Sequence, residues 1–111
     1  MEFIVGKDHR GKRDISVEDI IYVESYGDDI FVRVYGNSYK VQMKLHEFET
    51  TYSHLGLLRI NKSYVINVTK IRNVLPYLNY RLKLKMINDE VVYVNRTYMK
   101  TFKKYIKEGV I

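Results

Sequence analysis

Residues Leu58–Asn67, with the sequence L-R-I-N-K-S-Y-V-I-N, decide what the rest of the fold must accommodate. Apolar residues are interleaved here with two basic side chains, two asparagines, a serine and a tyrosine, which is not the pattern of an ordinary buried strand. Asn and Ser favour turns because their side chains hydrogen-bond the local backbone. We therefore predict a short strand ending at Ile60, a tight turn at Asn61-Lys62-Ser63, and a return to the core. This turn would present Asn61 and Lys62 outward from a well-anchored base.

Short β-branched and aromatic runs predict strands on the N-terminal side of this turn. The expected strands are residues 3–5, 13–15, 20–24, 30–35 and 38–42, and the expected connections are residues 7–12, 25–29 and 36–37. Between the second and third strands, Ser16 to Asp19 has the composition of a single helical turn with Ser16 as its cap. Further on, Leu45, Phe48 and Tyr52 lie at helical spacing and predict a short amphipathic helix that ends near Gly56.

The C-terminal side predicts a second group of strands and a final helix. Residues 68–74 lead to Pro76, which favours an edge strand or a bulge. From residue 80 to 87, apolar and basic residues alternate cleanly, and a turn at 88–90 precedes a strand at 91–94. Asn95 then resembles a helix cap, followed by an apolar stripe made of Tyr98, Phe102, Tyr105 and Ile106. The chain therefore predicts a mostly antiparallel β fold with a short mid-chain helix and a C-terminal helix.

Length and composition place this chain among single globular domains. It has 111 residues, of which 46% are hydrophobic, so one core is expected over residues 1–111. Cysteine is absent, which excludes a disulfide framework and agrees with a cytoplasmic location. Neither a membrane-spanning apolar run nor a signal-peptide core is present in the sequence.

The charge is distributed unevenly along the chain. Residues 1–55 contain 7 basic and 10 acidic side chains, whereas residues 56–111 contain 12 basic and 3 acidic side chains. Such asymmetry is typical of a surface that meets an anionic partner such as nucleic acid. A basic surface that is only solvated and has no anionic partner explains this uneven charge distribution equally well.

The sequence contains no pattern that predicts enzymatic chemistry. The three histidines, His9, His46 and His54, lack the spacing of a metal site, and no phosphate-binding or nucleophile motif occurs. The carboxylate pairs Asp28-Asp29 and Asp89-Glu90 fall in predicted turns, where acids are common for conformational reasons. We expect no enzyme activity, no metal and no cofactor.

The basic residues of the C-terminal half fall into two groups. Arg81, Lys83 and Lys85 form a ladder on one strand face, for which we favour an ordinary solvated sheet surface. Lys62 and Arg96 instead lie at junctions between elements. Arg can offer its planar fork to a guanine edge, Asn can do the same for adenine, and Lys can bind a guanine or a phosphate.

These features together resemble the LytTR DNA-binding domain of bacterial transcription regulators over roughly residues 16–106. The segments that carry the resemblance are D-I-I-Y-V-E-S-Y-G (19–27), F-V-R-V-Y (31–35), L-H-E-F-E (45–49), L-R-I-N-K-S-Y-V-I-N-V-T-K-I (58–71) and V-Y-V-N-R-T-Y (92–98). The resemblance implies elongated antiparallel β-sheets without a helix-turn-helix, and loops that enter successive major grooves. It also implies an output domain of response regulators in two-component systems.

The resemblance implies DNA contacts in three segments, which are Tyr26 to Asp29, Asn61-Lys62-Ser63 and Asn95-Arg96. The expected DNA-binding residues are Tyr26, Asn61, Lys62, Ser63, Asn95 and Arg96. Two departures from the family pattern stand out. Many members have His at the position of Asn61, and the acids Asp28 and Asp29 would repel phosphates.

Sequence-specific binding of double-stranded DNA at paired sites is the leading hypothesis, with weak or DNA-induced homodimerisation. A protein-interaction or signalling module with a basic surface is the alternative, and single-stranded RNA binding through exposed tyrosines is a third. A receiver domain is an expected partner if the chain belongs to a longer protein, and no membrane partner is expected.

Overall fold

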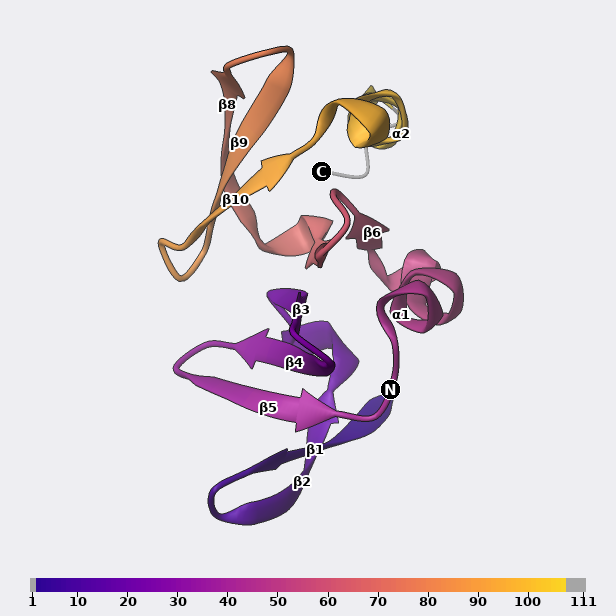
Figure 1. Cartoon of the computed structure of the whole chain (residues 1–111), viewed down its shortest axis with the longest axis vertical. Coiled ribbons are helices and arrows are strands. Elements are labelled where there is room, and N and C mark those ends of the chain that lie inside the picture. The colour runs from indigo at the N-terminus through magenta and orange to yellow at the C-terminus, as the bar shows by residue number, and fades with distance from the viewer. Residues whose placement is uncertain (1, 108–111) are drawn as a thin grey trace.

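A computed structural model describes residues 2–107, which form ten strands and two α-helices (Figure 1). The strands are β1 (Phe3–Asp8), β2 (Gly11–Ser16), β3 (Tyr22–Tyr26), β4 (Asp29–Val34), β5 (Asn37–Val41), β6 (Leu57–Arg59), β7 (Tyr64–Asn67), β8 (Ile71–Tyr77), β9 (Arg81–Met86) and β10 (Val91–Val94). The helices are α1 (Leu45–Tyr52) and α2 (Arg96–Lys107). Single 3₁₀ turns cover Val17–Asp19, Ser53–Leu55 and Val68–Lys70.

The strands form two antiparallel sheets. The larger has the order β2-β1-β5-β4-β3-β7-β6, and the smaller has the order β10-β9-β8. The described part of the chain measures 41 × 28 × 24 Å along its principal axes, so the molecule is elongated. Five strands separate α1 from α2, and residues 2–107 therefore contain no helix-turn-helix. The predicted fold class is confirmed.

Strands β3, β6 and β7 are buried on both faces, which divides the interior into two cores where the length of the chain predicted one. Consecutive side chains of a strand point to opposite faces of the sheet. Val65 accordingly packs in the first core and Ile66 in the second, although both are fully buried. This double burial explains why the central stretch lacks the simple apolar–polar alternation of a half-exposed strand.

The first core lies between the larger sheet and α1. Leu45, Phe48 and Tyr52 project from one side of α1 onto the sheet, as the helical spacing predicted. Gly56 adopts a φ of +96°, a left-handed conformation that glycine tolerates without strain, and it ends the 3₁₀ turn that follows α1. α1 itself ends at Tyr52, and the helical stretch that it forms with this turn ends at Gly56, as the sequence predicted.

The second core lies between the other face of β3, β6 and β7, the smaller sheet and α2. Leu84 and Met86 of β9 and Phe102 of α2 are fully buried there, and Leu82, Tyr98, Tyr105 and Ile106 pack around them. The predicted apolar face of β9 and the predicted stripe of α2 are therefore confirmed. Fully burying side chains of this size contributes roughly 1.5–3 kcal/mol each.

The first hairpin is longer than predicted. Pairing runs from Phe3 opposite Ser16 to Asp8 opposite Gly11, so only residues 9 and 10 form the connection. The Asp8 carboxylate accepts hydrogen bonds from the backbone N–H of Arg10 at 2.9 Å and from its guanidinium. This closure lets a two-residue turn join the strands. Residues 7, 8, 11 and 12, which were predicted to belong to the connection, are therefore strand residues.

Other boundaries also differ from the predictions. The turn predicted at 25–29 narrows to Gly27 and Asp28, and the turn predicted at 36–37 lies at Tyr35 and Gly36. The predicted strand at 20–24 begins at Tyr22, because residues 20 and 21 still belong to the connection after the 3₁₀ turn. Ser16 occupies the cap position of that turn but its side chain makes no capping hydrogen bond.

Pro76 lies in β8, which is an edge strand of the smaller sheet and has a register irregularity between Ile71 and Asn73. The predicted edge strand is confirmed, whereas the register irregularity lies near the start of β8 and not at Pro76. An edge position tolerates proline because its missing N–H falls on the side with no neighbouring strand. Within residues 2–107, no helix is long and apolar enough to cross a membrane.

Candidate nucleic-acid interface

The β6–β7 connection is a turn built from its own side chains. Asn61 Oδ1 accepts a 2.8 Å hydrogen bond from the backbone N–H of Ser63, as expected for an Asn-initiated turn. The Arg59 guanidinium donates to the carbonyls of Asn61 at 2.7 Å and Lys62 at 2.6 Å. Sequence reasoning missed this role of Arg59. An arginine placed two residues before an Asn-X-Ser turn is the signal that could have revealed it, because turn carbonyls need donors.

The turn is fastened to the junction between β10 and α2. Asn61 Nδ2 donates a 2.9 Å hydrogen bond to the backbone carbonyl of Tyr93. The backbone N–H of Asn95 donates to the carbonyl of Ile60 at the same distance. Two hydrogen bonds therefore hold the second and third predicted contact segments side by side.

The same turn is also fastened to the end of β3. The backbone N–H of Ser25 donates a 2.8 Å hydrogen bond to the carbonyl of Ser63, and Glu24 pairs with Tyr64 in the β3–β7 ladder. The exposed end of β3 at Tyr26 consequently lies next to the turn. Three segments that are far apart in the sequence form one continuous surface.

The six predicted contact residues divide by exposure. Tyr26 is 73% exposed, and Lys62 and Arg96 are exposed as well. Asn61, Ser63 and Asn95 are half-buried beneath them. The side chains of the first three residues project outward from this surface, and the other three residues form its hydrogen-bonded base.

The surroundings of Arg96 differ in part from the sequence predictions. The backbone carbonyl of Asn95 accepts a 2.9 Å hydrogen bond from the N–H of Tyr98, so the helix begins at Arg96. The predicted side-chain cap from Asn95 is absent from the hydrogen bonds of the described residues, which makes that prediction wrong. Glu90, the acid immediately before β10, accepts a 2.8 Å hydrogen bond from Arg33.

A tyrosine pair supports this surface from below. The rings of Tyr22 and Tyr64 lie 5.4 Å apart, and their hydroxyls donate to Glu90 and Glu24, respectively. Partial burial, together with these carboxylates, raises the pKa of both tyrosines, so they stay protonated as donors. Burial alone would raise the pKa of Glu90, but the hydrogen bonds from Arg33 and Tyr22 outweigh it and lower that pKa.

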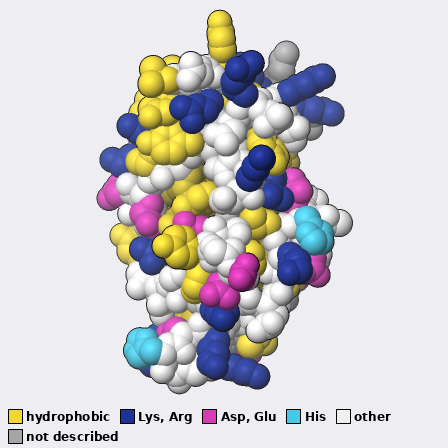
Figure 2. All heavy atoms as spheres, in the orientation of Figure 1, with side chains coloured by type: hydrophobic (Ala, Val, Ile, Leu, Met, Phe, Trp, Pro, Cys, Tyr) yellow, Lys and Arg dark blue, Asp and Glu magenta, His cyan; other side chains and the backbone are white. Residues whose placement is uncertain are grey.

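The electrostatics of the surface suit an anionic partner. Asp29, one of the two acids of the first turn, forms a 3.1 Å ion pair with Lys40, which offsets its charge. Figure 2 shows Lys and Arg side chains around the end of the molecule that carries β8, β9 and α2, and a second group at the opposite end, whereas the visible Asp and Glu side chains lie mainly between the two groups. The exposed lysines of α2 in this region are Lys100, Lys103 and Lys104.

The strand-face ladder is less exposed than its pattern suggested. Arg81, Lys83 and Lys85 are all half-buried. Lys85 lies 3.7 Å from Asp89, and the Arg81 guanidinium lies 5.0 Å from the centre of the Tyr77 ring. Among residues 2–107, no three His, Asp or Glu side chains converge in a way that could hold a metal ion.

Comparison with known proteins identifies the family. The family model described as the LytTr DNA-binding domain matches residues 11–107. The chain is therefore a β-rich DNA-binding domain and not an enzyme. It belongs to the LytTR family, as the sequence resemblance predicted.

Relatives of known sequence and structure agree with this assignment. The sensory transduction protein LytT of Bacillus subtilis is 28% identical over 92 residues, which is 83% of this chain and 38% of LytT. The transcriptional regulatory protein YpdB of Escherichia coli is 32% identical over 90 residues, which is 79% of this chain and 36% of YpdB. The chain thus spans little more than a third of the length of these relatives.

A solved structure shows the same fold. The LytTr domain of a methyl-accepting/DNA response regulator from Bacillus cereus superposes with a TM-score of 0.89 at 23% identity, covering 96% of this chain and 97% of that one.

Proposed function

We propose that this chain acts as one domain that binds double-stranded DNA in a sequence-specific manner and thereby regulates transcription in a bacterium. The three fastened segments are the reading surface in this proposal. Tyr26, Lys62 and Arg96 reach the DNA, and Asn61, Ser63 and Asn95 set their positions. The segments enter successive major grooves, where base edges present distinct patterns of donors and acceptors.

The observation that carries this proposal is the set of hydrogen bonds around the β6–β7 turn. Ser25, Ile60 and Asn61 each contribute one bond that joins the turn to a neighbouring segment. Base reading needs side chains held in a fixed geometry, because a bidentate contact requires both donors to align with two acceptors. Three loops locked to one another satisfy that requirement better than three independent loops.

Binding at paired sites, with weak or DNA-induced dimerisation, is part of the same proposal. LytT is named as a sensory transduction protein and YpdB as a transcriptional regulatory protein, and both are longer than this chain. We propose that a receiver domain controls the DNA-binding domain where the two occur together. A bacterial chromosome lies in the cytoplasm, which is where this function would place the protein.

Fluorescence anisotropy with a random duplex, a single strand and heparin tests the proposal. We expect tight binding of duplex with a steep decrease in affinity as salt rises, because counterions are released from the phosphates. Selection from a random duplex pool should then enrich one sequence. If the chain does not bind duplex at low salt, the alternative of a protein-interaction module with a basic surface holds instead. Preferential binding of single strands would indicate RNA as the ligand.

A further inference from the structure

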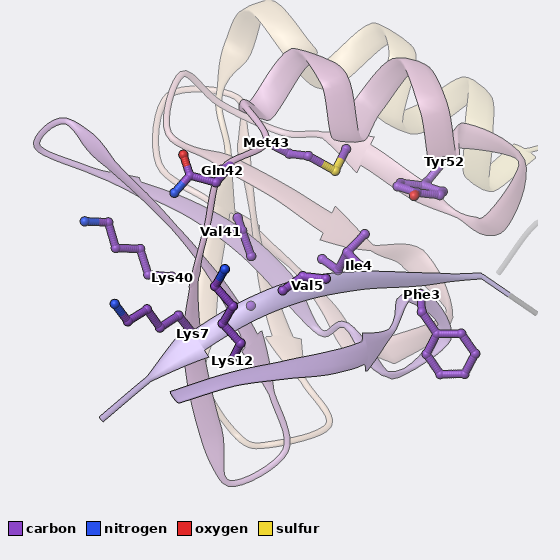
Figure 3. Close-up of a pocket in the computed structure, with 11 residues that line it drawn as sticks. Phe3, Ile4, Val5, Lys7, Lys12, Lys40, Val41, Gln42, Met43 and Tyr52 are labelled. Atoms are coloured by element: carbon purple, nitrogen blue, oxygen red, sulfur yellow. The ribbon is translucent and has the colours of Figure 1, made fainter. Parts of the chain in front are cut away.

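The larger sheet opens between β1 and β5. Strand β1 pairs with β2 along its whole length but is in register with β5 at one position only, where Lys7 lies opposite Lys40. Beyond that position the two strands diverge toward α1. A groove with a volume of about 610 Å³ fills the opening (Figure 3). This volume is within the range of small-molecule sites, roughly 300–1,000 Å³.

One end of the groove is apolar. Its walls include Val5, Val41, Met43 and Tyr52, the last of which reaches it from α1. Val5 is 57% exposed and Phe3 beside it is 54% exposed, although both belong to a strand. Exposed apolar side chains that line a concavity favour a ligand with an apolar body.

The other end of the groove is strongly basic. Lys12 lies directly opposite Lys7 in the β1–β2 ladder, and Lys7 lies directly opposite Lys40, so three lysines form a row across three strands. Figure 3 shows their side chains at the end of the groove away from Phe3 and Tyr52. Like charges directly opposite each other destabilise a sheet. A bound anion would relieve this repulsion.

The three lysines are not equivalent. Lys40 forms a 3.1 Å ion pair with Asp29, which balances its charge. Within residues 2–107, neither Lys7 nor Lys12 has a carboxylate within ion-pairing distance. Asp14 lies opposite Val5 on the same face of the hairpin and partly offsets the positive charge of Lys7 and Lys12, but it forms no ion pair with either ammonium group in the described residues. These two ammonium groups are therefore available to an anion.

We propose that this groove binds a free amphipathic anion, with a single carboxylate or phosphate head and an aliphatic or aromatic tail. The head group lies between the ammonium groups of Lys7 and Lys12, where charge-assisted hydrogen bonds are strong. The tail lies along Val5 and Val41 toward Met43 and Tyr52. The groove is formed by the β1–β5 side of the larger sheet and shares none of the six residues of the DNA-binding surface.

Titrations followed by amide and methionine-methyl NMR on the full chain test the site with three probes. Octanoate has both head and tail, acetate has only the head, and 1-octanol has only the tail. We expect octanoate, kept below its critical micelle concentration, to shift the groove amides and the Met43 methyl in a saturable manner. Acetate and 1-octanol should each bind at least about tenfold more weakly, because each loses one of the two recognised features.

Paired variants assign the binding to the groove. Lys7→Gln together with Lys12→Gln should weaken octanoate binding about tenfold or more, since both charge-assisted contacts are lost. Lys83→Gln together with Lys85→Gln removes the same charge from β9 and should leave the affinity unchanged. Met43→Gln should weaken octanoate binding without affecting acetate. If the first double variant loses its folded spectrum, Lys12→Gln alone serves the same purpose.

Several results would overturn the proposal. NMR chemical-shift changes with octanoate that do not saturate, or that spread over the whole surface, would contradict a specific site in the groove. Equal binding by the two double variants would show that net charge, and not the lysine row, attracts the anion. Shifts that appear only with anionic lipid vesicles would assign the surface to a membrane. Shifts of the same amides by duplex DNA, with none by octanoate, would assign the lysines to phosphate contacts.

Discussion

The side-chain amide of Asn61 donates a hydrogen bond of 2.9 Å to the backbone carbonyl of Tyr93, a residue 32 positions further along the chain. The opposite end of the same amide accepts from Ser63 and closes the β6–β7 turn. One side chain therefore shapes one predicted contact segment and fastens it to another. The position is structural as well as adjacent to the proposed DNA surface.

The substitution Asn61→Asp tests the hydrogen bond from Asn61 to Tyr93 separately from the closure of the turn. The aspartate keeps the acceptor for Ser63 but removes the donor to Tyr93 and puts a negative charge beside its carbonyl. Leaving a half-buried acceptor unsatisfied costs about 1–3 kcal/mol, so we expect a loss of that size in urea denaturation. Asn73→Asp makes the same chemical change at an exposed position of β8 and should be nearly neutral. Equal stability of the two variants would contradict a structural role for Asn61.

Arg96→Lys tests base reading. Lysine keeps the positive charge but lacks the planar fork that matches two acceptors of guanine. We expect non-specific duplex binding to persist and specific binding to fall by about 1–3 kcal/mol, the discrimination of one bidentate pair. Titration against the selected operator and a scrambled duplex at matched salt measures the specificity ratio. Arg13→Lys, at an exposed position of β2, should leave that ratio unchanged, and an unchanged ratio for Arg96→Lys would remove Arg96 from the base readers.

Lys62→Ala distinguishes a phosphate contact from a base contact at the tip of the β6–β7 turn. The side chain is exposed and only its backbone carbonyl serves the turn, so folding should be nearly unaffected. A phosphate contact predicts weaker binding of every duplex and a salt slope reduced by about one unit. A base contact predicts a loss confined to the operator. Affinities measured over a range of salt concentrations for both duplexes separate these outcomes.

Phe102→Ala tests whether α2 covers the second core. Phe102 is fully buried between α2 and the smaller sheet, and truncation of a buried phenylalanine costs about 3–5 kcal/mol. Chemical denaturation should show a decrease of this size in the free energy of unfolding. Thr101→Ala, on the exposed side of the same helix, should change it little. A loss below about 1 kcal/mol for Phe102→Ala would mean that the helix contributes little to the core.

Asp8 should make the first hairpin sensitive to acid. The backbone N–H of Arg10 lowers the pKa of this carboxyl from 3.8 to about 2, and hydrogen bonds from Asn37 and the Arg10 side chain act in the same direction. A carboxyl whose pKa is lower in the folded state stabilises the fold above its unfolded pKa, and this contribution disappears as the pH falls toward 2. Carbon NMR titration of the Asp8 carboxyl should give a midpoint well below the ordinary value of 3.8.

A comparison of Asp8→Asn with the unmodified chain tests whether ionisation of Asp8 makes the free energy of unfolding depend on pH. The difference in unfolding free energy between the two should be constant near neutral pH and should shrink as the pH falls from about 4 toward 2. A difference that stays constant down to pH 2 would contradict the lowered pKa of Asp8.

The order of residues is sufficient to predict the local elements and the family. The alternation that puts Leu84 and Met86 on one face of β9, and the spacing that puts Phe102 on the buried side of α2, are properties of consecutive residues in strands and helices. The turn at Asn61-Lys62-Ser63 could be predicted for the same reason, because Asn and Ser shape a turn through bonds to their nearest neighbours. Exact boundaries were less predictable, since strand pairing extended the first hairpin through residues with little intrinsic β preference.

Contacts between groups that are distant in the sequence depend on the three-dimensional arrangement of the strands and helices. Nothing in the order of residues pairs Asn61 with Tyr93, Arg33 with Glu90 or Ser25 with Ser63. The first two contacts depend on how the smaller sheet packs on one face of β3, β6 and β7, and the third depends on the pairing of β3 with β7. In each contact a donor meets its acceptor because of the position that this arrangement gives it. The surface that joins the three contact segments exists only because of this arrangement, and the lysine row across β2, β1 and β5 exists only because strand pairing in the larger sheet aligns Lys12, Lys7 and Lys40.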